Sequence, residues 1–181
     1  MAEQKLLVKR EGDFHYPIYF KNDFQDLAGA IREEGPENRK ICIVTDSHVA
    51  PLYHEAVKSA LQEISSEIFS FVFEAGEKNK NLNTVQELYK TLIENEMDRK
   101  GLLALGGGVV GDLTGFGAST YLRGIDFIQV PTTLLAQVDS SVGGKTGVDF
   151  LQYKNMVGAF HQPRLVYMNM STLQSLPNRE F

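Results

Sequence analysis

The stretch GLLALGGGVVGDLTG, residues 101–115, runs from apolar residues into a cluster of glycines. Its apolar first half has the composition of a buried strand, and the glycine-rich segment 109–122 has that of a helix. Gly106, Gly108 and Gly111 satisfy the pattern G-x-G-x-x-G, in which bare amides at a helix N-terminus bind a pyrophosphate. The stretch therefore predicts an α/β fold with a ligand site at a strand-to-helix turn.

Strand and helix patterns alternate along the chain on both sides of this stretch. Short apolar or β-rich runs predict strands at 14–20, 40–46, 66–74, 101–107, 126–131 and 164–169. Apolar residues at helical spacing predict helices at 23–35, 51–64, 83–97 and 109–122. This alternation predicts a single Rossmann-like α/β domain over 1–181, with a mostly parallel sheet and helices on both of its faces.

The composition argues against several classes of protein. Of the 181 residues, 43% are hydrophobic and 23% are charged, which suits one compact soluble domain. The net charge is −5 and no long basic run occurs, so nucleic acid is not an expected partner. No apolar segment reaches roughly 18 residues, so neither a membrane span nor an export signal is expected. The single cysteine, Cys42, lies in an apolar run, which predicts a buried thiol in a reducing, cytoplasmic compartment.

The glycine motif differs from a standard Rossmann fingerprint in its place along the chain. The standard motif lies in the first strand-helix-strand unit, and an acidic residue ends the next strand about 20 residues on. Here the motif comes late, and the nearest acidic candidate, Asp126, opens its strand. Asp112, directly after the glycines, either caps the helix or binds a ligand hydroxyl. A dinucleotide bound here would therefore not occupy the standard site.

Charged residues follow two other predicted strands at their carboxyl ends, the edge where doubly wound sheets bind ligands. Asp46 ends one strand and suits either a ribose hydroxyl or the N-cap of the next helix. Glu77, Lys78 and Lys80 follow the next strand, where they either hold the sugar and phosphates of a nucleotide or form a solvated loop. Both alternatives remain open at each place.

The segment QVPTTLLAQVDSSVGGKTGVD, residues 129–149, mixes polar residues with glycines and apolar residues. Gly144-Lys145-Thr146 matches the end of a P-loop, but Asp139 occupies the position of the first P-loop glycine and would repel the phosphate. The run TTLLAQVDSS also has the spacing of a short helix, which a P-loop lacks at this point. Several polar side chains of this region would be costly to bury unless a polar ligand paired with them: Thr132, Thr133, Asp139, Lys145, Lys154 and Asn155.

The other residues considered for chemistry are one arginine and the four histidines. Arg123 suits a receptor for phosphate or carboxylate, or a surface ion pair. The histidines show no metal-ligand spacing, so no complete metal site is expected in this chain. No G-x-S-x-G nucleophile motif occurs.

Four strings resemble a known family in their order along the chain: GGGVVGD (106–112), YLRGIDFIQVPTTLLAQVDSSVGGKTGVD (121–149), KNMVGAFHQP (154–163) and TLQSLPNRE (172–180). Together they resemble the amino-terminal domain of 3-dehydroquinate synthase, in the sugar-phosphate cyclase superfamily, over nearly the whole chain. The resemblance implies an NAD-binding α/β domain followed by a mostly helical domain. That second domain would bind a divalent metal, zinc or cobalt, through one glutamate and two histidines beyond Phe181. Because the chain ends where LPNRE begins a predicted helix, we expect it to be separated from its own C-terminal domain.

The resemblance also implies roles for particular residues. NAD contacts fall on Asp46, Glu77, Lys80, Gly107, Gly108, Val109, Gly111, Asp112, Thr132, Thr133, Lys145, Lys154, Thr172 and Ser175. Catalytic or substrate contacts fall on Asp139, Lys145, Lys154, Asn155 and Arg123. The arginine would reach into the neighbouring subunit of a homodimer and bind the substrate phosphate. Asn79 departs from the family pattern, since many relatives have an aromatic residue there.

The implied activity is a lyase reaction of the shikimate pathway, which leads to chorismate and the aromatic amino acids. It converts the sugar phosphate 3-deoxy-arabino-heptulosonate 7-phosphate to 3-dehydroquinate and phosphate. Transient oxidation by NAD would make a neighbouring C–H acidic enough for phosphate elimination, before reduction and an intramolecular aldol step. The metal would polarise the alcohol that is oxidised. Two alternatives are another sugar-phosphate cyclase, of the valiolone or deoxy-inosose synthase type, and an NAD-binding module that is inert in isolation.

Overall fold

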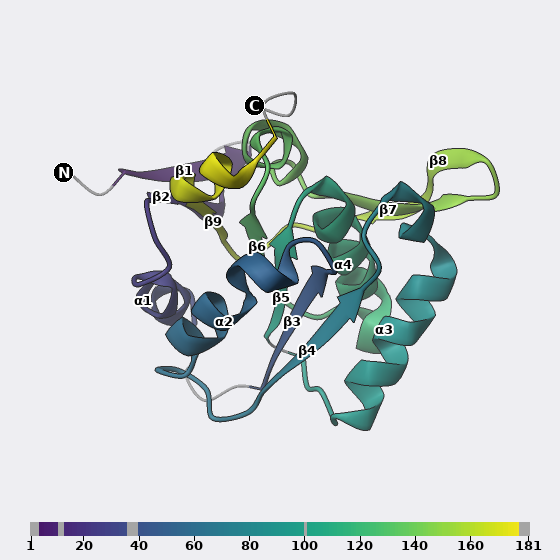
Figure 1. Cartoon of the computed structure of the whole chain (residues 1–181), viewed down its shortest axis with the longest axis horizontal. Coiled ribbons are helices and arrows are strands. Elements are labelled where there is room, and N and C mark those ends of the chain that lie inside the picture. The colour runs from purple at the N-terminus through teal and green to yellow at the C-terminus, as the bar shows by residue number, and fades with distance from the viewer. Residues whose placement is uncertain (1–3, 11–12, 36–39, 100, 178–181) are drawn as a thin grey trace.

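The computed structural model describes residues 4–10, 13–35, 40–99 and 101–177, and its centre is a seven-stranded sheet (Figure 1). The strand order is β1-β2-β9-β6-β5-β3-β4, in which β1 and β2 are antiparallel and all other neighbours are parallel. The strands are β1 Gln4–Arg10, β2 Asp13–Lys21, β3 Ile41–Asp46, β4 Ile68–Phe73, β5 Leu102–Gly106, β6 Phe127–Pro131 and β9 Val166–Asn169. The prediction of a mostly parallel α/β sheet is confirmed.

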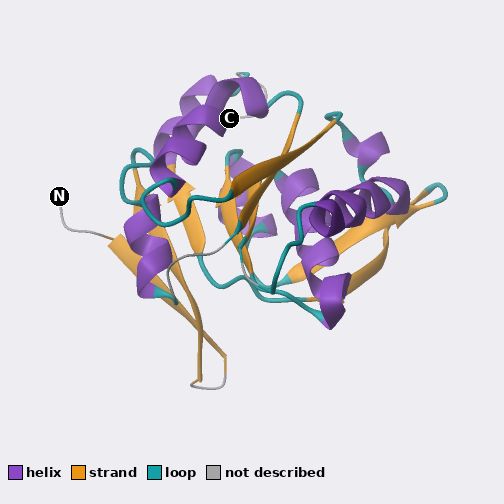
Figure 2. Ribbon diagram, turned by 90° about the horizontal axis from the view of Figure 1, so that it is seen from below, coloured by secondary structure: helices purple, strands orange, loops and turns teal. Residues whose placement is uncertain are grey.

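Helices cover both faces of the sheet, as predicted (Figures 1 and 2). They are α1 Leu27–Glu33, α2 Ala50–Leu61, α3 Leu82–Glu94 and α4 Gly108–Thr120. Leu27 and Leu61, from α1 and α2, belong to one buried cluster, and Leu88 and Leu113, from α3 and α4, belong to a second cluster. None of these helices is long and apolar enough to cross a membrane.

The strands β3, β5 and β6 are buried along their whole length, which explains why their sequences read as continuous apolar runs. Cys42 of β3 is fully buried, and this burial raises the pKa of its thiol to about 12. The prediction of a buried thiol is confirmed.

Helix α4 lies unusually close to its neighbours because glycines line it. A Cβ atom on Gly111 would lie 2.6 Å from Oε1 of Gln129 in β6. A Cβ atom on Gly115 would lie 2.4 Å from Cγ2 of Thr146, and one on Gly117 would lie 2.8 Å from Cδ2 of Leu88 in α3. Such separations are far below normal contact, so the glycines are what permits this packing.

A second, two-stranded sheet was not predicted. The strands β7 Lys145–Phe150 and β8 Tyr153–Phe160 form an antiparallel hairpin that projects from the main body (Figure 1). Gly147 and Gly158 face each other across it, and β8 is largely exposed, so its sequence lacks the apolar alternation of a half-buried strand. Strand β1 was missed as well, and two of its leucines, Leu6 and Leu7, are exposed.

Two further segments form helices that are not regular α-helices. The helix predicted within TTLLAQVDSS forms, and its last part, Ala136–Ser140, is π-helical, a form that is frequent at functional sites. Near the C-terminus a 3-10 helix spans Met170–Ser175. The predicted helix start at LPNRE falls largely on 178–181, which lie outside the described residues.

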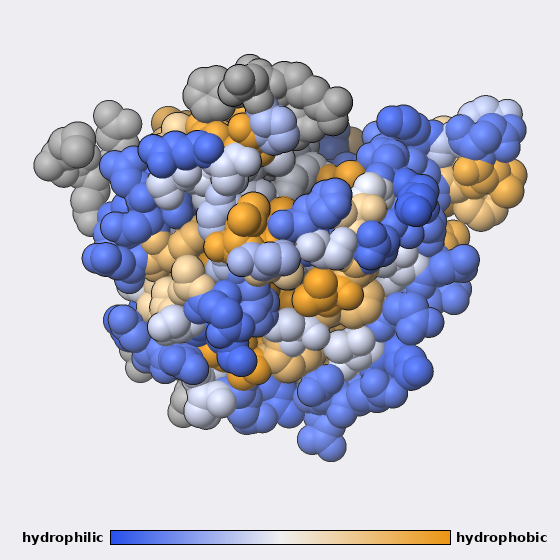
Figure 3. Space-filling model, viewed as in Figure 1, coloured by the Kyte–Doolittle hydropathy of each residue, from blue (hydrophilic) through white to orange (hydrophobic). Residues whose placement is uncertain are grey.

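Exposed apolar side chains gather on the projecting hairpin, whose tip is the orange group at the upper right of Figure 3. The exposed members are Phe150, Leu151, Tyr153, Met156 and Phe160. Contiguous apolar surface of this kind marks an interaction site in many proteins.

Replacing Gly115 by alanine is expected to lower the free energy of unfolding by about 1–3 kcal/mol, because the new methyl group would overlap the buried side chain of Thr146. That side chain has little freedom to move, since its hydroxyl donates to the main-chain oxygen of Ala159 at 2.7 Å. The matched change Gly29→Ala in α1, where nothing lies within 4 Å of the added carbon, should raise the free energy by about 0.5–1 kcal/mol. Urea denaturation of the purified chain measures the free energy of unfolding of both variants. Equal changes in Gly115→Ala and Gly29→Ala would contradict the role assigned to Gly115.

Candidate functional site

The carboxyl ends of three parallel strands meet at one edge of the sheet. Asp46 ends β3, Gly106 ends β5 and Pro131 ends β6, and the last two residues are directly paired. The order of the strands reverses between β3 and β5: β4 lies on the far side of β3, whereas β6 and β9 lie on the far side of β5. The edge between β3 and β5 is therefore a topological switch point, the place where doubly wound sheets bind ligands.

The glycine turn at this edge leaves the start of α4 without a side-chain cap. Gly107 is the N-cap residue and Gly108 is the first helical residue. A Cβ atom on Gly107 would lie 3.1 Å from Cγ2 of Thr133, and one on Gly108 would lie 3.0 Å from Oγ of Ser140. The Ser140 hydroxyl is itself buried without a hydrogen-bond partner among the described residues. The turn thus combines free helix-terminal amides with an unpaired hydroxyl, a combination suited to an anionic group.

Two predicted carboxylates have different local roles. Asp112 lies in α4 beyond its glycine N-cap and accepts a hydrogen bond from Nζ of Lys80 at 2.5 Å. The capping alternative for Asp112 is therefore wrong. Oδ1 of Asp46 accepts from the amides of His48 and Val49, both at 2.9 Å, so this residue does stabilise the turn before α2. Its contact with a cofactor stays a prediction.

Lys80 is buried and lies at the centre of a polar cluster with the half-buried Asp112 and the exposed Asn155. It is only 4% exposed, and its Nζ donates to Oδ2 of Asp112 and, at 2.6 Å, to Oδ1 of Asn155. Burial raises the pKa of Asp112 above its ordinary value, while Lys80 opposes this rise and the charges of Glu77 and Asp149 add to it. The lysine therefore partly offsets the cost of a negative charge on Asp112, in a place where an isolated charge would be unfavourable.

A cleft of about 510 Å³ opens beside this cluster, between α4, the π-helical segment and the hairpin. It is lined by Asp112, Asp139, Ser140, Val142, Lys145, Thr146, Gly147, Asn155, Met156, Gly158, Ala159 and Phe160. The structure thus brings Asp112, Asp139, Lys145 and Asn155 to one cavity, although the sequence separates them widely. Both cationic and anionic groups face the cleft, as binding of a phosphorylated polyol would require.

Other predicted residues lie at the rim or outside the cleft. Nζ of Lys154 lies 3.3 Å from Oε1 of Glu77, and both side chains are well exposed. Arg123 is exposed after the end of α4 with φ of +66°, and it does not line the cleft.

The remaining predicted cofactor residues lie along the same sheet edge. Thr132 is buried and its amide donates to the main-chain oxygen of Gly106 at 3.0 Å. Oγ1 of Thr133 accepts from an amide of the helical turn that follows. Near the C-terminus, Ser175 forms a hydrogen bond with the hydroxyl of Tyr53 at 2.5 Å. Val109 and Gly111 belong to the first turn of α4, and Thr172 is fully buried in the 3-10 helix.

Gln137 is a structural part of the site that sequence reasoning missed. Its Nε2 donates to the main-chain oxygens of Pro131 and Asn169, both at 3.2 Å, and to Oγ1 of Thr172 at 3.3 Å. It therefore ties the ends of β6 and β9 to the 3-10 helix. The available signal was a polar residue within an otherwise apolar helical run, although such a residue is more commonly exposed.

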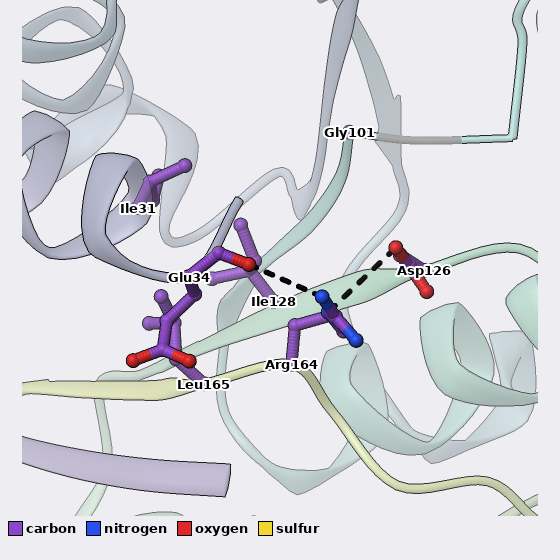
Figure 4. A pocket seen from close by; sticks show the side chains of 7 residues that line it. All are labelled: Ile31, Glu34, Gly101, Asp126, Ile128, Arg164 and Leu165. Carbon is purple, nitrogen blue, oxygen red and sulfur yellow. Dashed lines mark hydrogen bonds and ion pairs between the residues drawn. The ribbon is translucent and has the colours of Figure 1, made fainter. Parts of the chain in front are cut away.

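Asp126, the nearest acidic candidate for a standard Rossmann site, directly precedes β6 and so lies at the amino ends of the parallel strands. Figure 4 shows it beside Arg164. There its Oδ2 lies 3.7 Å from Nε of Arg164, whose Nη2 donates to the main-chain oxygen of Glu34 at 3.1 Å. Gly101 and Leu165 line the same small hollow. The inference that Asp126 is not the ribose carboxylate of a standard fingerprint agrees with this position.

The solved structures with the same fold include sugar-phosphate cyclases. A 2-deoxy-scyllo-inosose synthase complexed with carbaglucose-6-phosphate, NAD+ and Co2+ superposes with a TM-score of 0.87 and 26% identity, over 99% of this chain and 49% of that one. The 2-epi-5-epi-valiolone synthase of Streptomyces hygroscopicus, with NAD+ and Zn2+ bound, superposes with a TM-score of 0.81 and 30% identity, over 96% of this chain and 48% of that one. A glycerol dehydrogenase from Schizosaccharomyces pombe, 15% identical with a TM-score of 0.70 over 89% of this chain and 38% of that one, shares the fold alone.

Sequence comparison gives closer relatives. The 3-dehydroquinate synthase of Symbiobacterium thermophilum is 53% identical over 171 residues, which cover 93% of this chain and 48% of that protein. The 3-dehydroquinate synthase of Acetivibrio thermocellus is 50% identical over 169 residues, which cover 93% of this chain and 47% of that protein. The chain thus spans about half the length of the curated relatives it matches. Residues 70–181 match the family model described as 3-dehydroquinate synthase N-terminal, and the chain therefore belongs to the 3-dehydroquinate synthase family, to whose N-terminal part it corresponds.

Proposed function

We propose that this chain is the NAD-binding part of a 3-dehydroquinate synthase, which converts 3-deoxy-arabino-heptulosonate 7-phosphate to 3-dehydroquinate and phosphate. The observation that carries the proposal is the uncapped glycine turn of α4 beside the buried Lys80–Asp112 pair, at the switch point of the sheet. The family membership and the identities of about 50% to 3-dehydroquinate synthases support the choice of reaction.

The geometry of the turn fits a dinucleotide. The pyrophosphate would lie against the amides of Gly107 and Gly108, where side chains would fill the space, and Ser140 has an unpaired hydroxyl beside them. The carboxylate of Asp112 would accept a hydrogen bond from one ribose hydroxyl. Asp46 ends β3, the strand next to β5, and a second ribose would lie there. Glu77, Lys80, Val109, Gly111, Thr132, Thr133, Lys145, Lys154, Thr172 and Ser175 complete the proposed contacts.

The residues around the cleft would bind and orient the substrate. NAD, when bound, would supply the oxidation of one substrate hydroxyl and its later reduction. Lys145 faces the cleft and would pair with a phosphate or carboxylate oxygen, while Asp139 would accept a hydrogen bond from a substrate hydroxyl. Asn155 lines the cleft and the exposed Lys154 precedes it in β8, and both would fix the same polar groups. Positioning one flexible substrate would supply much of the acceleration.

The proposed reaction also involves a divalent metal and further protein. Among the described residues, no group of three or more His, Cys, Asp or Glu side chains could hold a metal. The family resemblance places zinc or cobalt in a C-terminal domain, and the Co2+ and Zn2+ in the two cyclase structures support a metal in this superfamily. Contact with this further protein would bury the apolar side chains of the hairpin, which are exposed in this chain.

We further propose a cytoplasmic homodimer. Arg123 is exposed and does not line the cleft of its own chain, which agrees with a role in binding phosphate in the cleft of a second subunit. The buried Cys42 thiol is compatible with a reducing compartment.

A second candidate is a different sugar-phosphate cyclase, because the structures with high TM-scores are 2-deoxy-scyllo-inosose and valiolone synthases. Their identities of 26% and 30% are well below the 53% and 50% of the 3-dehydroquinate synthases. The 3-dehydroquinate synthase reaction is therefore favoured.

Titration calorimetry of the chain with NAD should give measurable binding that Gly108→Val weakens at least about tenfold, because the added side chain would fill the space between the turn and Ser140. Gly29→Ala, in α1 on the other face of the sheet, should leave the dissociation constant unchanged. Equal affinity of the wild-type chain and Gly108→Val for NAD would contradict a pyrophosphate site at this turn.

Replacing Lys80 by methionine should make both stability and NAD binding depend on pH through Asp112. Without the lysine the pKa of Asp112 rises further, so the folded state binds a proton that the unfolded state releases, and the free energy of unfolding increases as pH falls through the folded pKa. We expect a loss of about 2–3 kcal/mol at alkaline pH that shrinks as the pH falls toward the ordinary pKa of an aspartate, while NAD binding weakens over the same fall in pH.

Chemical denaturation and calorimetry at several pH values measure these effects. Lys90→Met, at an exposed position of α3, is the matched control and should behave as the wild type does. A loss of stability in Lys80→Met that stays constant as the pH falls to the ordinary pKa of an aspartate would show that Asp112 does not depend on Lys80 for its charge.

A further inference from the structure

Asp149 lies opposite an irregularity in the β7–β8 hairpin. The strands pair regularly from Lys145 with Phe160 to Val148 with Val157, but the next pair is Phe150 with Tyr153. Three residues of β8, 154–156, therefore stand opposite Asp149 alone. Bulges of this kind redirect side chains beside active sites, and the redirected residues here include Lys154 and Asn155.

Asp149 connects this bulge to the loop that carries Lys80. Its Oδ1 accepts a hydrogen bond from the amide of Asn155 at 2.8 Å, and its own amide donates to the main-chain oxygen of Lys80, also at 2.8 Å. Asn81 forms an isolated parallel bridge with Asp149 beside these bonds. One residue thus joins two segments that are far apart in sequence.

The bond from Asp149 also stabilises an uncommon backbone conformation. Asn155 has φ of +55°, in the left-handed region, which asparagine tolerates better than most residues. In this conformation its Oδ1 accepts from Nζ of Lys80 at 2.6 Å, and the same Nζ binds Asp112. Asp149 is not among the residues that line the cleft, so apart from the effect of its charge on Asp112 it acts on the site through its bonds to Asn155 and Lys80.

We propose that Asp149 is a positioning residue of this site, which holds the β8 bulge against the loop of Lys80 and so fixes the ammonium group between Asn155 and Asp112. The consequence for NAD binding rests on the proposed function, whereas the consequence for Lys80 does not. Because the required feature is the acceptor oxygen, asparagine at position 149 should replace the aspartate, and alanine should not.

The first test needs no ligand. Acetic anhydride at low concentration acetylates lysines at rates that follow their exposure and bonding, and mass spectrometry of peptides reports the rate at each position. Lys80 should react slowly in the wild-type chain and in Asp149→Asn, and about tenfold faster in Asp149→Ala. The exposed Lys90 provides an internal reference and should react equally in all variants.

A second variant guards against a folding defect in Asp149→Ala. Asn155→Gly keeps the left-handed backbone free of strain and removes only the side-chain acceptor, so it should also accelerate acetylation of Lys80. Since the two residues act in series, Asp149→Ala combined with Asn155→Gly should add little to either single change. Additive effects on the Lys80 rate would overturn the proposal.

Calorimetric titration with NAD completes the test. Asp149→Ala should weaken NAD binding about tenfold and Asp149→Asn should restore it, a rescue that a loss of stability alone would not give. Unchanged Lys80 reactivity in Asp149→Ala overturns this inference, as does equal acceleration in the alanine and asparagine variants. Absence of NAD binding by the wild-type chain would instead count against the proposed function, and the acetylation rates would still decide the role of Asp149.

Discussion

The close approach of α4 to the sheet is the constraint on which the rest of the structure depends. Added Cβ atoms at Gly111 and Gly115 would lie 2.6 Å from Gln129 and 2.4 Å from Thr146, so no larger side chain fits without movement. This spacing lets β7 pack across α4 and brings the hairpin to the cleft. It also directs the uncapped N-terminus of α4 to the carboxyl edge of β5. A helix displaced outward would lose both the turn and the wall of the cavity.

The same packing explains how a buried lysine comes to pair with a half-buried carboxylate. Lys80 reaches Asp112 from a loop after β4, and Asn155 reaches the same lysine from the hairpin, so three separate segments satisfy one another. Removing both charges from water is unfavourable, and the cluster compensates with short hydrogen bonds to the ammonium group. The charged groups are therefore oriented by the protein itself, which suits a site that must hold a polar cofactor and substrate in fixed positions.

Much of the fold follows from local sequence because the central strands are buried on both faces. ICIVTD, LLALG and FIQVP form β3, β5 and β6, whose burial is complete, and the helices between them show regular apolar spacing. The hairpin and β1 escape this reasoning. The side chains of β8 and the two leucines of β1 are largely exposed, and the pairing of Gly147 in β7 with Gly158 depends on backbone approach rather than on side-chain periodicity.

For the candidate site, the sequence by itself determined which chemical groups stand at the carboxyl ends of the strands: the glycines after β5, Asp46 after β3 and the threonines after β6. Parallel strands bring such groups to one edge whatever the details of packing. Only the tertiary structure decided which polar groups bind each other. Lys80 meets Asp112 across 32 positions and Asn155 across 75. These pairings depend on the distance between α4 and the sheet and on the bulge opposite Asp149, which no local pattern specifies.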